Sequence, residues 1–266
     1  MWSLEKTKEI CIKIDAQVEG LYNKIKLFFI GKVFIKLISE IVLALLIAVF
    51  TYLATSFYHN RTAELETNKK LEQIYVSVSD EYVNALFGSP YVTLKETDEL
   101  TNNFYIVEDD VILRTVSKNN NVIAFFITST NEKRKIPINT YDDAKTIGEI
   151  VYTESDYAGE HREAYYCGNG RDNYYYEIQG TGRYGMYNHY LYGTVSYGFL
   201  DSRSIELVTV VGLDNDIDQT LIDDLREEVK PNTFGVIADG YQDVVSVIPI
   251  CDEWLNIYYL LDNISN

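Results

Sequence analysis

Histidine and cysteine are scarce in this sequence, and the few copies lie far apart. There are three of each, and none shows the Cys/His spacing of a zinc site. Cys167 follows His161 by six residues without a nucleophile motif around it, and His189 lies in a tyrosine-rich stretch typical of strands. We therefore expect no metal, no cofactor and no catalytic residue.

The cysteines also bear on the compartment. Cys11 precedes a long apolar run, whereas Cys167 and Cys251 follow it. If the part after the run faces an oxidising exterior, Cys167 and Cys251 can form a disulfide. The alternative is two buried free thiols.

Basic residues are scarce and unevenly placed. The formal net charge is −17, yet residues 1–36 carry seven lysines against four acidic residues. Residues 37–266 carry sixteen basic and thirty-six acidic residues. Because binding to a nucleic-acid backbone depends on Lys and Arg that displace counterions, we expect no nucleic-acid partner.

The apolar run has no charge over eighteen residues, from Ile41 to Tyr58. With the apolar residues from Val33 onward, it reaches the ~20 residues that cross the hydrocarbon layer of a membrane. Tyr52 and Phe57 suit aromatic anchors at an interface. We predict a transmembrane helix over 33–58 that places the protein in the cell membrane, in contact with the lipid bilayer. The alternatives are a buried helix of a soluble protein and a signal peptide.

Ahead of this run, apolar residues recur every seven positions. One heptad position holds Leu4, Cys11, Val18 and Ile25, and the other holds Thr7, Ile14, Leu21 and Phe28. Lysines flank this stripe, as they do on a helix that lies in the inner headgroup region. We predict an amphipathic juxtamembrane helix over 1–32. The alternative is a short coiled coil that pairs subunits into a homo-oligomer.

Basic residues near the run set its expected orientation. Four lysines precede it and three basic residues follow it: Lys24, Lys26, Lys32 and Lys36, then Arg61, Lys69 and Lys70. The excess of one residue favours a single-pass protein with its N-terminus inside and its soluble domain outside.

The first part of the soluble domain reads as a helix followed by strands. Residues 59–76 have the charged pattern of a helical stalk. The segment 77–130 then begins with a helix from Val78 to Phe87, with Ser79 or Asp80 as its N-cap. Four strand-like runs follow at 91–95, 103–107, 111–117 and 122–129. We predict a helix plus an antiparallel meander.

A polar linker at 131–135 leads to a tyrosine-rich α+β unit over 141–266 that packs with the first. We expect a helix over 142–150, strands between 152 and 211 that include 204–211, a helix over 219–230, and closing elements at 236–248 and 254–261. The predicted fold class is α+β. One N-terminal transmembrane helix, preceded by an amphipathic helix, is followed by a soluble domain dominated by antiparallel β-sheet with a few short helices.

Two motifs carry a resemblance to known families. The segment 77–128, whose helix ends in Leu86–Pro90, resembles the helix-plus-meander fold of BamE/SmpA-like proteins. The step Pro231–Gly235, taken with the anchor, is similar to a family of bacterial single-span membrane proteins with an uncharacterised soluble domain. Neither resemblance implies an enzyme. The chain departs from the BamE-like pattern because it lacks a lipid-anchoring cysteine.

Two further patterns look like ligand loops but lack essential positions. Residues 214–218 begin like a calcium loop, yet Leu225 stands where the bidentate glutamate belongs. The glycines between 168 and 185 lack the lysine and the strand-to-helix setting of a phosphate loop. Helix capping and tight turns explain these patterns better.

The tyrosine-rich segment 165–197 is the candidate binding surface. Tyr and Arg are enriched at binding hot spots because they supply rigid contact area with a polar tip. The residues that we expect to contact a ligand are Tyr174, Tyr176, Arg183, Tyr187, Tyr190 and Tyr192. The alternative is a sheet with a wet aromatic face and no partner.

Together these features favour a single-pass, membrane-anchored binding or sensing protein. Its acidic, β-rich domain would meet an unknown protein, glycan or small-molecule ligand through exposed tyrosines. The first alternative is an oligomerising membrane effector or scaffold in bacterial defence or stress response, and the second is a hydrolase.

Overall fold

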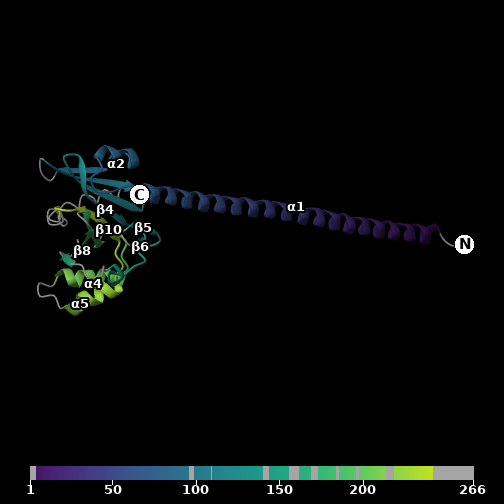
Figure 1. The fold of residues 1–266 in the computed structure, drawn as a ribbon. Helices are drawn as coiled ribbons and strands as arrows, with labels where there is room; N and C mark the ends of the chain where they lie inside the picture. The colour runs from purple at the N-terminus through teal and green to yellow at the C-terminus, as the bar shows by residue number, and fades with distance from the viewer. Residues whose placement is uncertain are drawn as a thin grey trace. The chain divides into compact units, whose positions relative to one another are not determined.

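The computed structural model describes residues 4–95, 99–108, 110–139, 144–155, 162–168, 173–183, 186–195, 198–213 and 219–241. The chain divides into two compact units, residues 1–64 and residues 65–266. Figure 1 labels the helices and strands.

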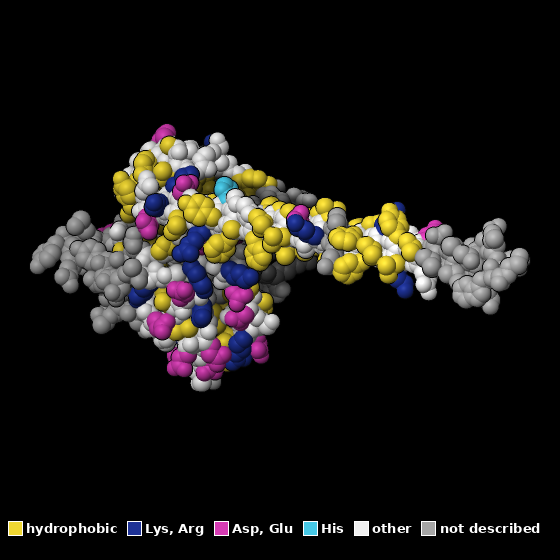
Figure 2. Space-filling model, turned by 90° about the vertical axis from the view of Figure 1, so that its right-hand side faces the viewer, with side chains coloured by type: hydrophobic (Ala, Val, Ile, Leu, Met, Phe, Trp, Pro, Cys, Tyr) yellow, Lys and Arg dark blue, Asp and Glu magenta, His cyan; other side chains and the backbone are white. Residues whose placement is uncertain are grey.

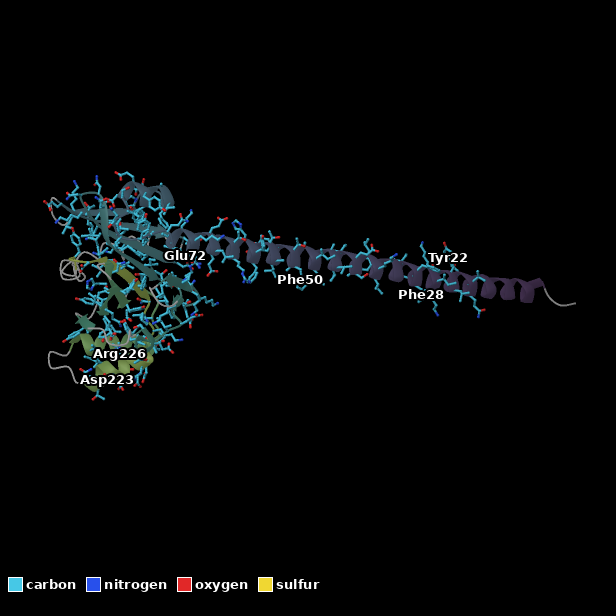
Figure 3. The ribbon with its side chains drawn as sticks, viewed as in Figure 1. Tyr22, Phe28, Phe50, Glu72, Asp223 and Arg226 are labelled. Atoms are coloured by element: carbon cyan, nitrogen blue, oxygen red, sulfur yellow. The ribbon has the colours of Figure 1, made fainter. Side chains whose placement is uncertain are left out.

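Helix α1 (Leu4–Leu71) accounts for the first unit and supplies the opening residues of the second. The sequence pattern divided this stretch into an amphipathic helix, a span and a stalk, whereas the structure has one helix without a break. It is the one helix in the described chain that is long and apolar enough to cross a membrane. Large apolar side chains are exposed both in the apolar run and ahead of it, as the labelled Phe50, Tyr22 and Phe28 illustrate (Figure 3).

The second unit is built on an eight-stranded, fully antiparallel sheet in the order β1-β2-β3-β4-β10-β9-β8-β7. Its strands are β1 (Val92–Lys95), β2 (Leu100–Val107), β3 (Val111–Lys118), β4 (Asn121–Ser129), β7 (Arg162–Gly168), β8 (Asn173–Arg183), β9 (Met186–Val195) and β10 (Thr233–Ala238). A separate hairpin joins β5 (Ile136–Asn139) to β6 (Ala144–Ile147). The predicted α+β class is confirmed.

Strand β10 joins the two halves that the sequence separated. The meander β1–β4 and the meander β7–β9 meet through it, because β10 pairs with β4 on one side and with β9 on the other. The two halves therefore share one sheet. The linker expected at 131–135 does not keep them apart, since Arg134 within it is buried.

The Pro231–Gly235 step forms this joint. The side-chain amide of Asn232 accepts a hydrogen bond from the backbone N–H of Val195 at 3.0 Å and donates to the Val195 carbonyl at 2.8 Å. Gly235 lies opposite Phe126, and a Cβ at this position would overlap the Phe126 ring. The step is thus explained by packing between strands far apart in sequence.

The remaining helices are α2 (Asp80–Phe87), α3 (Tyr152–Ser155), α4 (Ser202–Leu213) and α5 (Gln219–Glu228). Helix α2 begins as predicted, because the Ser79 hydroxyl accepts a hydrogen bond from the N–H of Tyr82. It ends at Gly88, whose φ of 81° favours glycine. The helix predicted over 219–230 is also confirmed.

Two local predictions are wrong. Residues 204–211, expected as a strand, belong to α4: the Asp201 carboxylate caps the helix by accepting from the N–H of Ser204, and Leu207, Val208 and Val211 share its buried face. Part of the segment 142–150, expected as a helix, forms β6, which pairs with β5 and buries Ile147. The closing element at 254–261 and most of that at 236–248 lie outside the described residues.

The sheet has a core on each face. One core joins the sheet to the end of α1 and to helices α2 to α5, through residues such as Leu71, Val83 and Leu225. The other contains strand residues such as Phe104, Phe126 and Leu191. Because side chains alternate along each strand, the tyrosines of β8 and β9 whose side chains are described divide between these two cores.

Candidate functional site

The predicted tyrosines lie on strands of the sheet, and those whose side chains are described do not form an exposed surface. Tyr190 and Tyr192 are buried in the helix-covered core, and Tyr176 is buried in the opposite core, where Tyr174 stacks on it with ring centroids 4.9 Å apart. The expectation of solvent-exposed tyrosines is therefore wrong for Tyr176, Tyr190 and Tyr192. The alternating pattern was correct for strands, but both faces of the sheet are covered.

The other two predicted residues lie where β8 meets β9. Arg183 pairs with Met186, and Tyr187 pairs with Gly182. These backbone positions are described and their side chains are not. The six predicted residues thus fall on two adjacent strands, and the buried tyrosines among them divide between opposite faces.

Tyr190 also lines an apolar pocket in the second unit, which we call the helix-end pocket. Its floor is three neighbouring strands, β4, β10 and β9, and its walls are the end of α1 with the residues after it, and β5. The lining residues are Leu71, Glu72, Ile74, Tyr75, Val76, Phe125, Ile127, Pro137, Ile138, Asn188, Tyr190, Phe234 and Val236.

The floor of the helix-end pocket is aromatic, and its opening is more polar. Tyr190 stacks on Phe234 with ring centroids 5.9 Å apart. Glu72 and Tyr75 are exposed. The pocket volume is about 140 Å³, which is close to cavities that hold one benzene-sized molecule and below the usual range for drug-sized ligands. The pocket therefore suits one apolar group.

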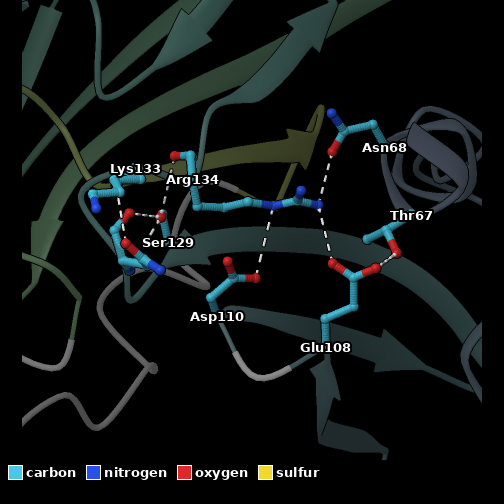
Figure 4. Close-up of polar contacts among 8 residues, drawn as sticks. Thr67, Asn68, Glu108, Asp110, Ser129, Lys133 and Arg134 are labelled. Carbon is cyan, nitrogen blue, oxygen red and sulfur yellow. Dashed lines mark hydrogen bonds and ion pairs between the residues drawn. The ribbon is translucent and has the colours of Figure 1, made fainter. Parts of the chain in front are cut away.

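A buried arginine fixes the wall that α1 contributes (Figure 4). The Arg134 guanidinium donates a hydrogen bond to the Asn68 side chain at 3.0 Å and lies 3.5 Å from Glu108 and 3.8 Å from Asp110. Thr67, one residue earlier on α1, donates to the Glu108 carboxylate. We call these five residues the Arg134 clamp. It ties the last turns of α1 to the β2–β3 turn.

The electrostatics of the clamp follow from burial. Only 2% of the Arg134 side chain is exposed, and this burial lowers the pKa of its guanidinium. Two carboxylates and an amide oxygen surround the cation, which offsets the cost of removing it from water. Sequence reasoning missed the clamp because its members lie far apart in the chain.

A second buried polar cluster holds α5 on the sheet. Arg226 donates to the Glu177 carboxylate at 2.7 Å, and the Tyr175 hydroxyl donates to the same oxygen at 2.6 Å. The Tyr152 hydroxyl donates to the Tyr175 carbonyl at 3.1 Å and lies 2.7 Å from the Thr194 hydroxyl. Burial raises the pKa of Tyr152 well above its ordinary value. These side chains hydrogen-bond to one another or to the backbone of the sheet, so the cluster holds α5 in place.

The residues considered for catalysis do not converge. His189, within β9, lies 3.6 Å from Asp239, which follows β10 and is exposed. His161, Cys251 and the segment 214–218 lie outside the described residues, as does the Cys167 side chain. In the part of the chain that the structure describes, no group of three or more His, Cys, Asp or Glu residues could hold a metal ion.

Comparisons with known proteins add little. No family model and no curated protein matches the chain. Among solved structures, the chain is similar to an extracellular protein containing an SCP domain from Bacillus anthracis, at 8% identity and a TM-score of 0.32. The match covers 62% of this chain and 44% of that one, so the chain spans less than half of its length. A likeness at this level carries no argument about function.

Proposed function

We propose that this chain is a single-pass membrane protein that anchors a binding domain and senses a ligand at the end of its anchor helix. The observation that carries the proposal is that Leu71, the last residue of α1, is a wall of the helix-end pocket. A group that fills this pocket touches the same helix that holds the apolar run. The domain would lie outside the cell, with the N-terminus inside.

The membrane part of the proposal is supported by exposure. The most apolar stretch of α1 is not buried in the protein, and large side chains such as Phe50 and Leu53 are exposed. Figure 2 shows hydrophobic side chains gathered along the helix. A core helix of a soluble protein would bury such residues, and exposing them to water is unfavourable by ~25 cal/mol per Å². Lipid provides the missing apolar surroundings.

The sensing part is supported by the Arg134 clamp. The clamp fixes Thr67 and Asn68, one turn before the pocket wall at Leu71. An apolar group in the pocket would change the packing of Leu71 and Ile74. Because the clamp holds the preceding turn in place, this change in packing would be confined to the end of α1. The ligand class that fits is a small apolar molecule or one apolar side chain of a partner.

Benzene is a suitable probe, because cavities of this size bind it. We expect benzene to slow amide hydrogen exchange over 67–74 in the full chain held in lipid nanodiscs. Val236→Phe, which fills the pocket from β10, should abolish the effect, as should Ile74→Phe from the opposite wall. Val210→Phe is the matched control, because Val210 is exposed on α4 and should leave the effect intact. Equal protection in all four proteins would contradict the proposed pocket.

A second candidate function, an oligomerising effector or scaffold, is favoured by the stripe ahead of the span. Val18, Leu21, Ile25 and Phe28 are all exposed on α1. Their heptad spacing suits a pair of helices. Concentration-dependent crosslinking that disappears in Val18→Glu would support this function, and an oligomer size unaltered by the substitution would refute it.

A further inference from the structure

A second pocket lies where four connections of the sheet domain converge, and we call it the loop pocket. They are the β4–β5, β6–α3, β9–α4 and α5–β10 connections. The lining residues are Ser129, Asn131, Glu132, Arg134, Lys135, Ile147, Gly148, Phe199, Leu200, Asp201, Ser204, Glu228, Lys230, Pro231 and Asn232. Its volume is about 160 Å³, and unlike the helix-end pocket it is lined by charges of both signs.

Four of its charged residues are occupied within the protein. Lys135 donates to the Gly148 carbonyl at 2.9 Å, and the Asp201 carboxylate accepts from the N–H of Ser204 at 2.7 Å. Glu228 pairs with Arg203 at 2.8 Å. Arg134 belongs to the clamp. These four residues build the walls and are not available to a ligand.

Three polar groups of the loop pocket remain available. Within the described residues, neither Lys230 nor Glu132 has an ion-pair or hydrogen-bond partner for its side chain, although both line the same pocket. The hydroxyl of Ser204 is likewise without a partner there. Ser204 as a whole is only 5% exposed, but its hydroxyl oxygen is not among the buried unsatisfied atoms and can therefore be reached from the pocket side by water or a ligand.

We propose that the loop pocket binds a small zwitterion of the amino-acid class. Its carboxylate would accept hydrogen bonds from the Lys230 ammonium and the Ser204 hydroxyl, and its ammonium would donate to the Glu132 carboxylate. A charge-assisted hydrogen bond is about twice as strong as a neutral one, so the two charged ends provide most of the recognition. A singly charged molecule satisfies only one end.

The size of the loop pocket limits the size of the zwitterion that it can hold. The volume of about 160 Å³ is close to that of cavities that hold one benzene-sized molecule, and an amino acid with a small side chain such as alanine is of that size. Phe199 and Ile147 supply apolar surface for one methyl group. Nucleotides and oligosaccharides are too large.

The Pro231–Gly235 step, which joins the two halves of the sheet, also shapes the loop pocket. Asn232 fixes the start of the β9–α4 connection through Val195 and donates to the Phe199 carbonyl at 3.2 Å. Pro231, which precedes it, lines the pocket, and Phe234, two residues later, lines the helix-end pocket. The Pro231–Gly235 step therefore shapes both pockets.

The test is a saturation-transfer NMR titration of the full chain in lipid nanodiscs with L-alanine, acetate and methylammonium. We expect alanine to bind at least tenfold more tightly than either single-charge fragment. Lys230→Met and Glu132→Gln should each weaken alanine binding at least tenfold, whereas Lys230→Arg should retain most of it. The result is independent of the helix-end pocket, because no residue lines both pockets.

Matched controls separate a site from a general effect of charge. Lys133→Met and Glu227→Gln make the same charge changes at exposed residues outside the pocket, and they should leave binding unchanged. Three results would overturn the proposal: no detectable alanine binding, equal affinity for alanine and acetate, or equal weakening by Lys133→Met and Lys230→Met.

Discussion

The two units differ in how far they expose their tyrosines. In α1, Tyr52 and Tyr58 expose 73% and 74% of their surface, whereas Tyr152 and Tyr192 in the sheet domain are fully buried. The helix also exposes its large aliphatic residues, whereas the domain buries charged groups such as Glu177. The difference teaches that the domain has an interior of its own, whereas the helix exposes its apolar side chains, as the proposed membrane span requires. Substitutions should therefore act on one unit without the other.

The largest effect is expected from breaking the buried ion pair. Glu177→Ala leaves the Arg226 cation without its carboxylate, and the domain should lose about 3–5 kcal/mol of unfolding free energy. The measurement is denaturant unfolding of the full chain. Arg203→Met, which removes an exposed ion pair, is the control and should leave the midpoint unchanged within error. Equal losses of unfolding free energy in both variants would contradict the expected difference between a buried and an exposed ion pair.

The next effect concerns the helix alone. Leu46→Arg places a charge in the middle of the apolar run and should disfavour membrane insertion by about 3 kcal/mol. The protein recovered in the membrane fraction after alkaline extraction should fall, while the unfolding midpoint of the domain stays the same. Unchanged extraction together with a destabilised domain would mean that the helix is packed in protein.

A smaller loss of stability is expected from substituting a glycine of the sheet than from substituting a buried charge, and none is expected from substituting a glycine of α1. Gly235→Ala forces a Cβ against the Phe126 ring and the Phe125 carbonyl, which should lower the unfolding free energy by about 1–3 kcal/mol. Gly20→Ala in α1 meets nothing within 4 Å and should be neutral or stabilising. The same denaturant series measures both variants. An unchanged unfolding free energy in Gly235→Ala would contradict the close approach of β10 to β4.

The smallest effect appears at high pH. Burial, with a further contribution from Asp80, raises the pKa of Tyr105 to about 12, so the folded state keeps the phenol neutral where an unfolded tyrosine ionises. Stability from this group is complete below pH ~10 and is lost as the pH rises toward 12. Tyr105→Phe should flatten this decline, and it also loses the hydrogen bond to Asn84, about 1 kcal/mol. A decline as steep as in the wild type would exclude Tyr105 as its source.

Local signals in the sequence were sufficient for several elements. The Ser79 cap and Gly88 delimited α2, turn residues separated the strands of the first meander, and Pro231 marked the end of α5. The apolar run was visible because its eighteen consecutive residues carry no charge. Such features depend on residues close together in the chain.

Features that depend on distant residues could not be predicted. The β-branched residues of 204–211 favour a strand, but packing of Leu207 and Val211 against the sheet selects a helix. Alternating tyrosines indicate strands without saying what covers each face. The pairing of β10 with β4, the Arg134 clamp and both pockets arise only when distant segments meet, and Thr128 and Thr233, for example, are 105 residues apart.

Thiol labelling in intact bacterial cells tests the central claim most directly. Single cysteines at Ser3 and Ser265, in a chain whose Cys11, Cys167 and Cys251 are replaced by serine, would be treated with a membrane-impermeant maleimide. A single-pass anchor with its domain outside predicts labelling at position 265 and none at position 3. Labelling at both positions would contradict a membrane span, and labelling at position 3 alone would contradict the proposed orientation.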